Sequence, residues 1–265
     1  MTINTTIRSI ASRRRAPAES APVAASGEVA QCKTVCSNCN LREVCVPCCE
    51  LTRSEMDRAD LLVFNRVQVR RGDNLYRTGD RFGSLYAVRN GFFKSVGVLE
   101  NGREQVTGFS MVGEILGMDG IGSGEHAFDT VALEDSEVCA IPFTGLQELA
   151  QEIPALQRHF YKMMSREIER DHGVILHLGS MTADERLAMF LLDLSRRFAA
   201  RGYSATEFNL RMTREEIGSY LGLKLETVSR TFSRFQDQGL IGVQLKFIRI
   251  RNSRALEQVM GRDSA

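Results

Sequence analysis

The sequence lacks any apolar run long enough to cross a lipid bilayer. Its longest apolar stretches, such as Leu61 to Phe64, are far shorter than the ~18 to 20 residues that a transmembrane helix needs. The N-terminus also lacks the apolar segment of a secretory signal, because Arg13, Arg14 and Arg15 follow soon after Ile10. We therefore expect a cytoplasmic protein with no membrane partner.

Net charge is also small, at +1 for the 265 residues. From Asp184 onward, however, 14 Lys and Arg face 10 Asp and Glu, whereas the rest of the chain carries 20 against 23. A basic C-terminal part on a slightly acidic body is a weak indication of nucleic-acid binding. The composition, 43% hydrophobic and 25% charged, is typical of a globular chain and excludes collagen, rods and long disorder as the overall answer.

Two common enzyme signatures are incomplete. The glycines between Gly117 and Gly124 resemble a phosphate-binding loop, but no Lys-Ser or Lys-Thr pair follows them. The four histidines do not have the spacing of a metalloprotease site. Neither pattern predicts catalysis.

Cysteine, in contrast, is concentrated in one place. Six of the seven cysteines fall between Cys32 and Cys49, and the seventh is Cys139. The odd count and the length of the chain argue against a disulfide scaffold and favour metal ligation or redox chemistry. Cys36, Cys39 and Cys45 lie within ten residues and Cys139 can complete a set of four thiolates, which suits an iron-sulfur cluster and structural zinc alike.

Other uses of these cysteines remain open. Cys45 and Cys48 form a second C-x2-C, so a zinc site made of Cys36, Cys39, Cys45 and Cys48 is an alternative that leaves Cys139 as a small core residue. A thiol oxidoreductase using Cys36 and Cys39 is less favoured, because this pair lies in a cysteine-dense loop instead of at the start of a helix that follows a strand.

The middle of the chain has the pattern of an antiparallel β-domain and then a long helix. From Val67 to Phe143, turn signals such as Asn90-Gly91 and Asn101-Gly102 recur every 7 to 12 residues, which predicts a barrel or roll. After Pro154 no proline interrupts the chain as far as Met181, and spacings of 3 and 4 residues form a heptad seam. The predicted dimer-interface residues in this seam are Tyr161, Met164, Ile168, Asp171, Ile175 and Leu178.

Two short helices are predicted near the C-terminus. Thr213 and Glu216 have the spacing of a capping box, which starts a helix that should end at Gly222. A second helix should run from about Leu225 to Gln238, with Val228, Phe232 and Phe235 as its buried stripe. With the basic hairpin that follows, these helices predict a winged helix-turn-helix whose second helix enters the major groove of DNA.

The exposed side chains of this second helix are the candidates for reading bases. Arg230 is suited to guanine and Glu226 to the cytosine amino group, while hydroxyls accept several partners. The predicted base contacts are Glu226, Thr227, Ser229 and Arg230, and the predicted phosphate contacts are Arg214, Lys224, Arg234 and Lys246. A two-fold dimer would place two such helices one DNA turn apart and therefore bind an inverted repeat.

At this point the sequence resembles a known family. The four cysteines Cys36, Cys39, Cys45 and Cys139 occur together with Gly108-Phe109, Gly122-Ser123-Gly124, Glu185-Arg186-Leu187, Leu194-Ser195-Arg196-Arg197-Phe198 and Glu226-x2-Ser229-Arg230. This combination, from about Cys32 to Gly261, resembles the fumarate and nitrate reduction regulator (FNR) family of the cyclic-AMP receptor protein superfamily. The resemblance implies a homodimeric transcription factor, active when oxygen is scarce, with an oxygen-labile 4Fe-4S cluster on those four cysteines and RNA polymerase as a partner.

One departure from the superfamily bears on its usual ligand. Receptors in this superfamily hold a cyclic phosphate with an arginine in a segment after a Gly-Glu pair. Gly113-Glu114 is present here, but the later segment, Glu125 to Thr130, has no arginine. We therefore expect no cyclic nucleotide as a ligand.

The expected fold is α+β and the chain is not expected to be an enzyme. The predicted parts are a flexible tail (1–30), a cysteine segment (31–50), a β-roll sensor domain (51–153), a dimerisation helix (154–182) and a winged helix-turn-helix domain (183–265).

Overall fold

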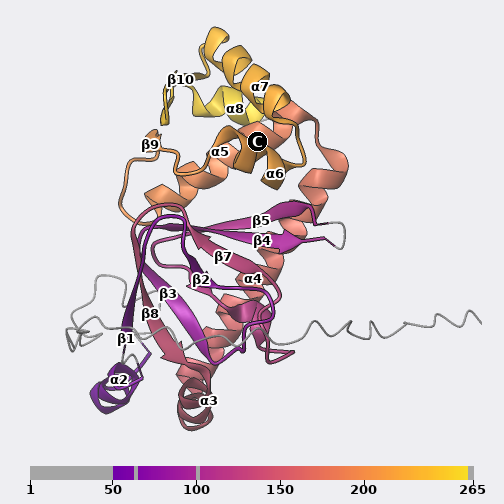
Figure 1. Ribbon diagram of the computed structural model, residues 1–265. Helices are drawn as coiled ribbons and strands as arrows, with labels where there is room; N and C mark the ends of the chain where they lie inside the picture. The colour runs from indigo at the N-terminus through magenta and orange to yellow at the C-terminus, as the bar shows by residue number, and fades with distance from the viewer. Residues whose placement is uncertain (1–49, 63–64, 100–101, 262–265) are drawn as a thin grey trace, which may run out of the picture. The chain divides into compact units, whose positions relative to one another are not determined.

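The computed structural model describes residues 50–62, 65–99 and 102–261, and Figure 1 shows their helices and strands. The N-terminal part of this region is an antiparallel β-domain of two four-stranded sheets, with strand orders β1-β8-β3-β6 and β2-β7-β4-β5. The strands are β1 (Asn65–Val69), β2 (Asn74–Tyr76), β3 (Ser84–Asn90), β4 (Phe92–Val98), β5 (Glu104–Met111), β6 (Ile115–Leu116), β7 (Asp129–Ala132) and β8 (Ser136–Pro142).

Turn chemistry and side-chain alternation explain this roll. Strands β3 and β4 are joined at Gly91, whose φ of 96° suits a residue without a side chain, and a Cβ there would collide with Ser136. In β3, Leu85 and Ala87 face one apolar cluster, whereas Val88 joins another cluster with Phe93. The antiparallel roll that the turn signals predict is confirmed.

Three helices accompany the first sheet. They are α2 (Arg53–Asp60), α3 (Phe143–Glu152) and α4 (Pro154–Ser180), and a 3-10 turn, η2 (Met118–Gly120), follows β6. Met56 of α2 and Leu146 of α3 pack in one buried cluster with Leu85, as does Leu156 in the first turn of α4. Proline at the first position of α4 costs no hydrogen bond, because that N–H has no partner within a helix.

The C-terminal unit contains the predicted helix pair and hairpin. Its elements are α5 (Ala183–Ala199), β9 (Glu207–Asn209), α6 (Arg214–Leu221), α7 (Leu225–Asp237), β10 (Ile241–Gln244), β11 (Phe247–Ile250) and α8 (Ser253–Val259). Buried side chains of α5, α6 and α7 share one core with Phe92 and Val96 of β4 and with Phe109 and Met111 of β5. The sequence-based fold class, an α+β chain with a β-roll, a long helix and a C-terminal winged helix-turn-helix, is therefore confirmed.

None of the helices in the described part of the chain is long and apolar enough to cross a membrane.

Candidate nucleic-acid interface

The helix pair is built by local signals. The Thr213 side chain accepts from the Glu216 N–H at 3.1 Å and the Glu216 carboxylate accepts from the Thr213 N–H at 2.7 Å, so the predicted capping box is present. Helix α6 ends at Gly222, whose φ is 63°. A second glycine is needed within α6, because a Cβ at Gly218 would lie 2.6 Å from the Leu223 carbonyl oxygen. These features turn the chain sharply into α7.

Helix α7 has one buried face and one open face. The predicted stripe of Val228, Phe232 and Phe235 is 0%, 3% and 1% exposed and lies in the common core. On the opposite face, the predicted base-contact residues Glu226, Ser229 and Arg230 are exposed and Thr227 is partly exposed. The structure thus leaves this face of α7 open, and base contact by these four residues stays a prediction.

The four predicted phosphate contacts fall into two groups. Lys224, just before α7, and Lys246, in the hairpin, are exposed, and Lys246 Nζ donates to the Arg211 carbonyl at 3.1 Å. Arg234 instead pairs with Asp184 of α5, which also accepts from Thr231 at 3.3 Å.

Arg214 is more deeply engaged. Its guanidinium carbon lies 3.1 Å from the ring centre of Phe232, and burial lowers the pKa of Arg214 to about 10. Arg214 and Arg234 therefore hold α7 against its neighbours, a role that the sequence did not reveal. Their contact with phosphates stays a prediction.

The hairpin of β10 and β11 forms the wing beside this helix pair. Leu245 at its tip is 97% exposed and has a φ of 56°, which is unusual for a branched side chain. Near the base of the wing, a cavity of about 190 Å³ is lined by basic, polar and apolar side chains, among them Gln236, Arg249 and Arg251. The hairpin and the residue after it thus carry Lys246, Arg249 and Arg251, of which Arg249 pairs with Glu207 at 2.7 Å.

The seam along α4 lies outside the core. Tyr161, Ile168 and Ile175 are 58%, 52% and 67% exposed, which is unusual for large apolar side chains on one helix. Asp171 is also exposed, and Met164 and Leu178 are partly buried. Association of two copies through these residues stays a prediction.

Of the predicted metal ligands, only Cys139 lies in the described part of the chain. It is half-buried on β8, between Arg66 of β1 and Ala87 of β3, and packs against the cluster that contains Leu51 and Met56. Cys36, Cys39 and Cys45, together with Cys32, Cys48 and Cys49, lie outside the described residues. Among the residues described, no group of three or more His, Cys, Asp and Glu side chains could hold a metal ion.

The segment that lacks the expected arginine, Glu125 to Thr130, contacts residues of β2 and η2. His126 is 3% exposed and stacks on Tyr76 with ring centres 3.7 Å apart. Asp119 accepts from the Ala127 N–H at 2.8 Å and lies 3.4 Å from His126 Nδ1. These contacts connect the segment to β2 through Tyr76 and to η2 through Asp119.

The comparisons with known proteins agree with this architecture. Residues 185–259 match the Crp-like helix-turn-helix domain and residues 66–152 match the cyclic nucleotide-binding domain. The chain is 47% identical to the transcriptional regulatory protein btr of Bordetella pertussis, over 86% of this chain and 94% of that protein. It is 44% identical to the fumarate and nitrate reduction regulatory protein of Escherichia coli, over 87% of this chain and 92% of that protein.

A solved structure is similar too. FixK2 of Bradyrhizobium japonicum matches with a TM-score of 0.69 and 30% identity, over 76% of this chain and 98% of that one.

Proposed function

Because the chain belongs to the FNR/CRP family of DNA-binding transcription regulators, which are not enzymes, we propose that it regulates transcription in response to oxygen. In this proposal a homodimer binds an inverted-repeat DNA site while a 4Fe-4S cluster is intact. Oxygen degrades the cluster, and dimerisation and DNA binding are then lost.

The observation that carries the DNA-binding role is the open polar face of α7. Arg230 is long enough to donate two bonds to a guanine, and Glu226 is suited to accept from a cytosine amino group. Lys224 and Lys246 supply positive charge at the start of α7 and in the wing, where phosphates would lie on each side of the groove. Arg214 and Arg234 keep α7 rigid by their contacts with Phe232 and Asp184.

The exposed apolar seam of α4 supports a homodimer. Association would bury apolar surface of Ile168 and Ile175, which are exposed in the single chain, and this burial favours a dimer. Asp171 opposes association, since two carboxylates that face one another in a partly dry seam repel. Because apolar burial favours the dimer and repulsion between the Asp171 carboxylates opposes it, a small change in the sensor domain can shift the monomer–dimer equilibrium.

The sensor is proposed to hold its cluster through Cys36, Cys39, Cys45 and Cys139. Cys139 fits this role, because it is half-buried and packs against the same apolar cluster as Leu51, which follows the proposed ligand Cys45 by six residues. The cluster, when bound, supplies iron-sulfide bonds that oxygen attacks. The chain's own part is to fix one ligand on the rigid strand β8 while three others come from a short segment that precedes α2.

Two further points of the proposal concern partners. We propose that no cyclic nucleotide binds, since the segment from Glu125 to Thr130 contains no arginine to pair a phosphate and its His126 is stacked on Tyr76. RNA polymerase is the proposed protein partner, because the relatives named above are transcription regulators.

The test is DNA binding by protein purified without oxygen, on a site selected from a random DNA library. We expect an inverted repeat to be selected, and fluorescence anisotropy should show tight binding that weakens after exposure to air. Cys139→Ser should bind weakly in both conditions, whereas Cys32→Ser should behave like the parent. Equal binding before and after air by a zinc-containing protein would refute oxygen sensing while leaving the DNA-binding role intact.

A further inference from the structure

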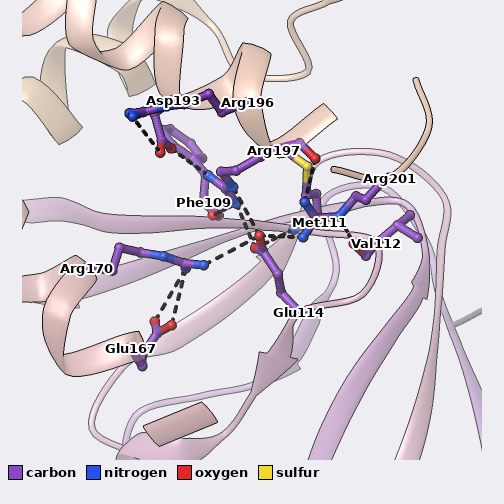
Figure 2. Close-up of polar contacts among 10 residues, drawn as sticks. All are labelled: Phe109, Met111, Val112, Glu114, Glu167, Arg170, Asp193, Arg196, Arg197 and Arg201. Carbon is purple, nitrogen blue, oxygen red and sulfur yellow. Dashed lines mark hydrogen bonds and ion pairs between the residues drawn. The ribbon is translucent and has the colours of Figure 1, made fainter. Parts of the chain in front are cut away.

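A buried ionic junction connects the β-roll to the helices that carry the DNA-binding unit. Its centre is Glu114, in the turn between β5 and β6, where the Glu114 N–H donates to the Met111 carbonyl at 3.0 Å. Gly113 makes this turn possible with a φ of 84°. Figure 2 shows the Glu114 carboxylate with Arg170 of α4, Arg197 of α5 and Arg201 of the turn after α5 directed at it.

Arg197 of α5 and Arg201, in the turn just after α5 ends, make the closest contacts. Arg197 binds the carboxylate with two nitrogens, at 3.0 Å to Oε1 and 2.6 Å to Oε2, and Arg201 binds Oε1 at 2.7 Å. Both arginines also hydrogen-bond to the backbone at the end of β5. Arg197 donates to the Phe109 carbonyl at 2.7 Å, and Arg201 donates to the Val112 carbonyl. The fork of a guanidinium makes this double attachment possible.

Helix α4 joins the same junction through Arg170. Its guanidinium lies 3.4 Å from Glu114 Oε1 and also 3.4 Å from Glu167, one turn away on α4. One carboxylate therefore contacts the helix predicted to form the dimer and the first helix of the DNA-binding unit. The Glu114 side chain is 12% exposed, and those of Arg197 and Arg201 are 16% exposed.

The opposite charges of Glu114 and its arginine partners keep these side chains ionised despite burial. Burial alone would favour neutral Glu114, but Arg197 and Arg170 outweigh it and hold the pKa of Glu114 below its ordinary value. Burial likewise opposes the charge of Arg197, and Glu114 raises its pKa above the ordinary value. Removal of the Glu114 charge leaves Arg197 with Asp193 at 3.4 Å, whereas removal of the Arg197 charge leaves Glu114 with Arg201 at 2.7 Å and Arg170 at 3.4 Å. The junction therefore depends most on Glu114, which all three arginines share.

A second contact holds the helix pair on the same sheet. Strand β5 is an edge strand, and its Val106 N–H donates to the Ser219 hydroxyl of α6 at 2.8 Å. Lys94 of β4 pairs with Glu216 of α6 at 2.8 Å. The same strand and helix are also in contact through Phe109 of β5 and Tyr220 of α6, whose ring centres lie 5.2 Å apart.

These attachments are compatible with DNA binding, because Glu226, Ser229 and Arg230 stay exposed while they are formed. The junction therefore does not cover the candidate DNA-binding face. Helix α5, which the junction holds, is tied to α7 through Asp184 and its partners Thr231 and Arg234. The direction of α7 relative to α4 thus depends on where Glu114 holds α5.

We propose that Glu114 is a positioning residue that sets the spacing between half-sites which the dimer accepts. Two recognition helices read an inverted repeat only when they are held about one DNA turn apart. When the α5 helices of the dimer are fixed to the β-roll and to α4, the dimer accepts one spacing between DNA half-sites. Looser attachment would let the α7 helices reach half-sites at neighbouring spacings. The affinity of the dimer for its preferred spacing would then be lower. The inference rests on the proposed dimeric DNA binding.

The chain offers a closely matched control. Glu137 on β8 pairs with Arg89 at 2.9 Å and Arg66 at 3.7 Å, and its side chain is 17% exposed. Its partners lie on β1 and β3, so Glu137→Gln also removes a shielded carboxylate from two arginines but leaves the helices attached. Glu114→Gln and Glu137→Gln are therefore nearly the same chemical change at two places, of which only the first touches the junction.

The experiment measures binding of full-length protein, purified without oxygen, to inverted repeats whose half-sites are moved apart or together by one or two base pairs, and to a single half-site. Wild type and Glu137→Gln should strongly prefer one spacing. In Glu114→Gln, the ratio of the affinity for the preferred spacing to that for neighbouring spacings should fall at least about fivefold. Its affinity for a single half-site should be unchanged. Arg201→Lys keeps the positive charge but loses the several N–H donors of the guanidinium, so it should reduce the spacing preference in the same way but by less. It also provides a second test if Glu114→Gln does not fold.

Three outcomes would overturn the inference. If Glu114→Gln and Arg201→Lys keep the wild-type preference, the junction does not set spacing. A uniform loss on every DNA, single half-site included, would show a role in stability alone. Wild type that binds inverted repeats no better than a single half-site would remove the proposed dimeric function itself, and this inference with it.

Discussion

Arg186 joins three helices through backbone carbonyls, and its replacement should destabilise the protein substantially. Its Nε donates to Met181 at 2.9 Å, Nη2 to Leu178 at 2.7 Å and Nη1 to Leu221 at 3.0 Å. These carbonyls lie at the ends of α4 and α6, where no partner within the helix is available. A single guanidinium on α5 therefore donates hydrogen bonds to the backbone carbonyls at the C-terminal ends of both α4 and α6.

The expected cost follows from these bonds. A hydrogen bond from a charged donor contributes about 1.5 to 3 kcal/mol, and the lower end applies here because Arg186 is only partly buried. Allowing for water that replaces some of the lost bonds, Arg186→Met should lower the free energy of unfolding by about 3 to 4 kcal/mol. Methionine keeps the apolar stem, so the loss reports mainly on the hydrogen bonds.

Urea unfolding at one fixed protein concentration measures this cost. Arg196→Met is the control, because Arg196 lies on the same helix, is 66% exposed and approaches Asp193 only to 4.0 Å. It should change the unfolding free energy by no more than about 0.5 kcal/mol. A loss below about 1 kcal/mol for Arg186→Met, or one equal to that of the control, would refute the view that these carbonyl bonds hold α4, α5 and α6 together.

Three other predictions concern association, base reading and acid stability. Asp171→Ala should dimerise and bind DNA even after air has removed the cluster, and sedimentation showing a monomer would exclude Asp171 as the opposing charge. Arg230→Ala should lose ~1 to 3 kcal/mol of discrimination at one base pair per half-site, whereas Lys224→Ala should weaken binding to all sequences and flatten its salt dependence. The pKa of Glu114 is lowered in the folded chain, so its stabilisation is present above the ordinary value of 4.5 and is lost as pH falls through the folded pKa. The difference in stability between wild type and Glu114→Gln should thus be constant near neutral pH and shrink below about pH 4.5; a difference that grows on acidification would reverse the assigned sign.

Features that depend on neighbouring residues were predictable from the sequence. The capping box of Thr213 and Glu216 and the turn at Gly222 are set by backbone geometry within one or two turns, so their residue types identify them. The same signature occurs at Thr52 with Glu55 and at Thr182 with Glu185, where α2 and α5 begin. Periodicity likewise predicted the buried stripe of α7.

Contacts between distant segments were not predictable in this way. In the sequence Glu114 stands out only as part of a Gly-Glu pair, because its partners Arg197 and Arg201 lie 83 and 87 residues further along the chain. A spacing of four residues suits one face of a helix, but α5 ends at Ala199, so Arg201 reaches Glu114 from the turn that follows the helix. Arg214 shows the same limit, because only the packed helix pair reveals that its charge lies over the Phe232 ring.

The most direct test of oxygen sensing is the visible spectrum of the protein purified without oxygen, with iron and sulfide determined on the same sample. The account predicts a brown protein with about four iron and four sulfide per chain, whose absorption is lost in air. Serine at Cys36, Cys39, Cys45 or Cys139 should abolish the colour, whereas serine at Cys48 should not. A colourless protein with stoichiometric zinc and no sulfide would contradict the account.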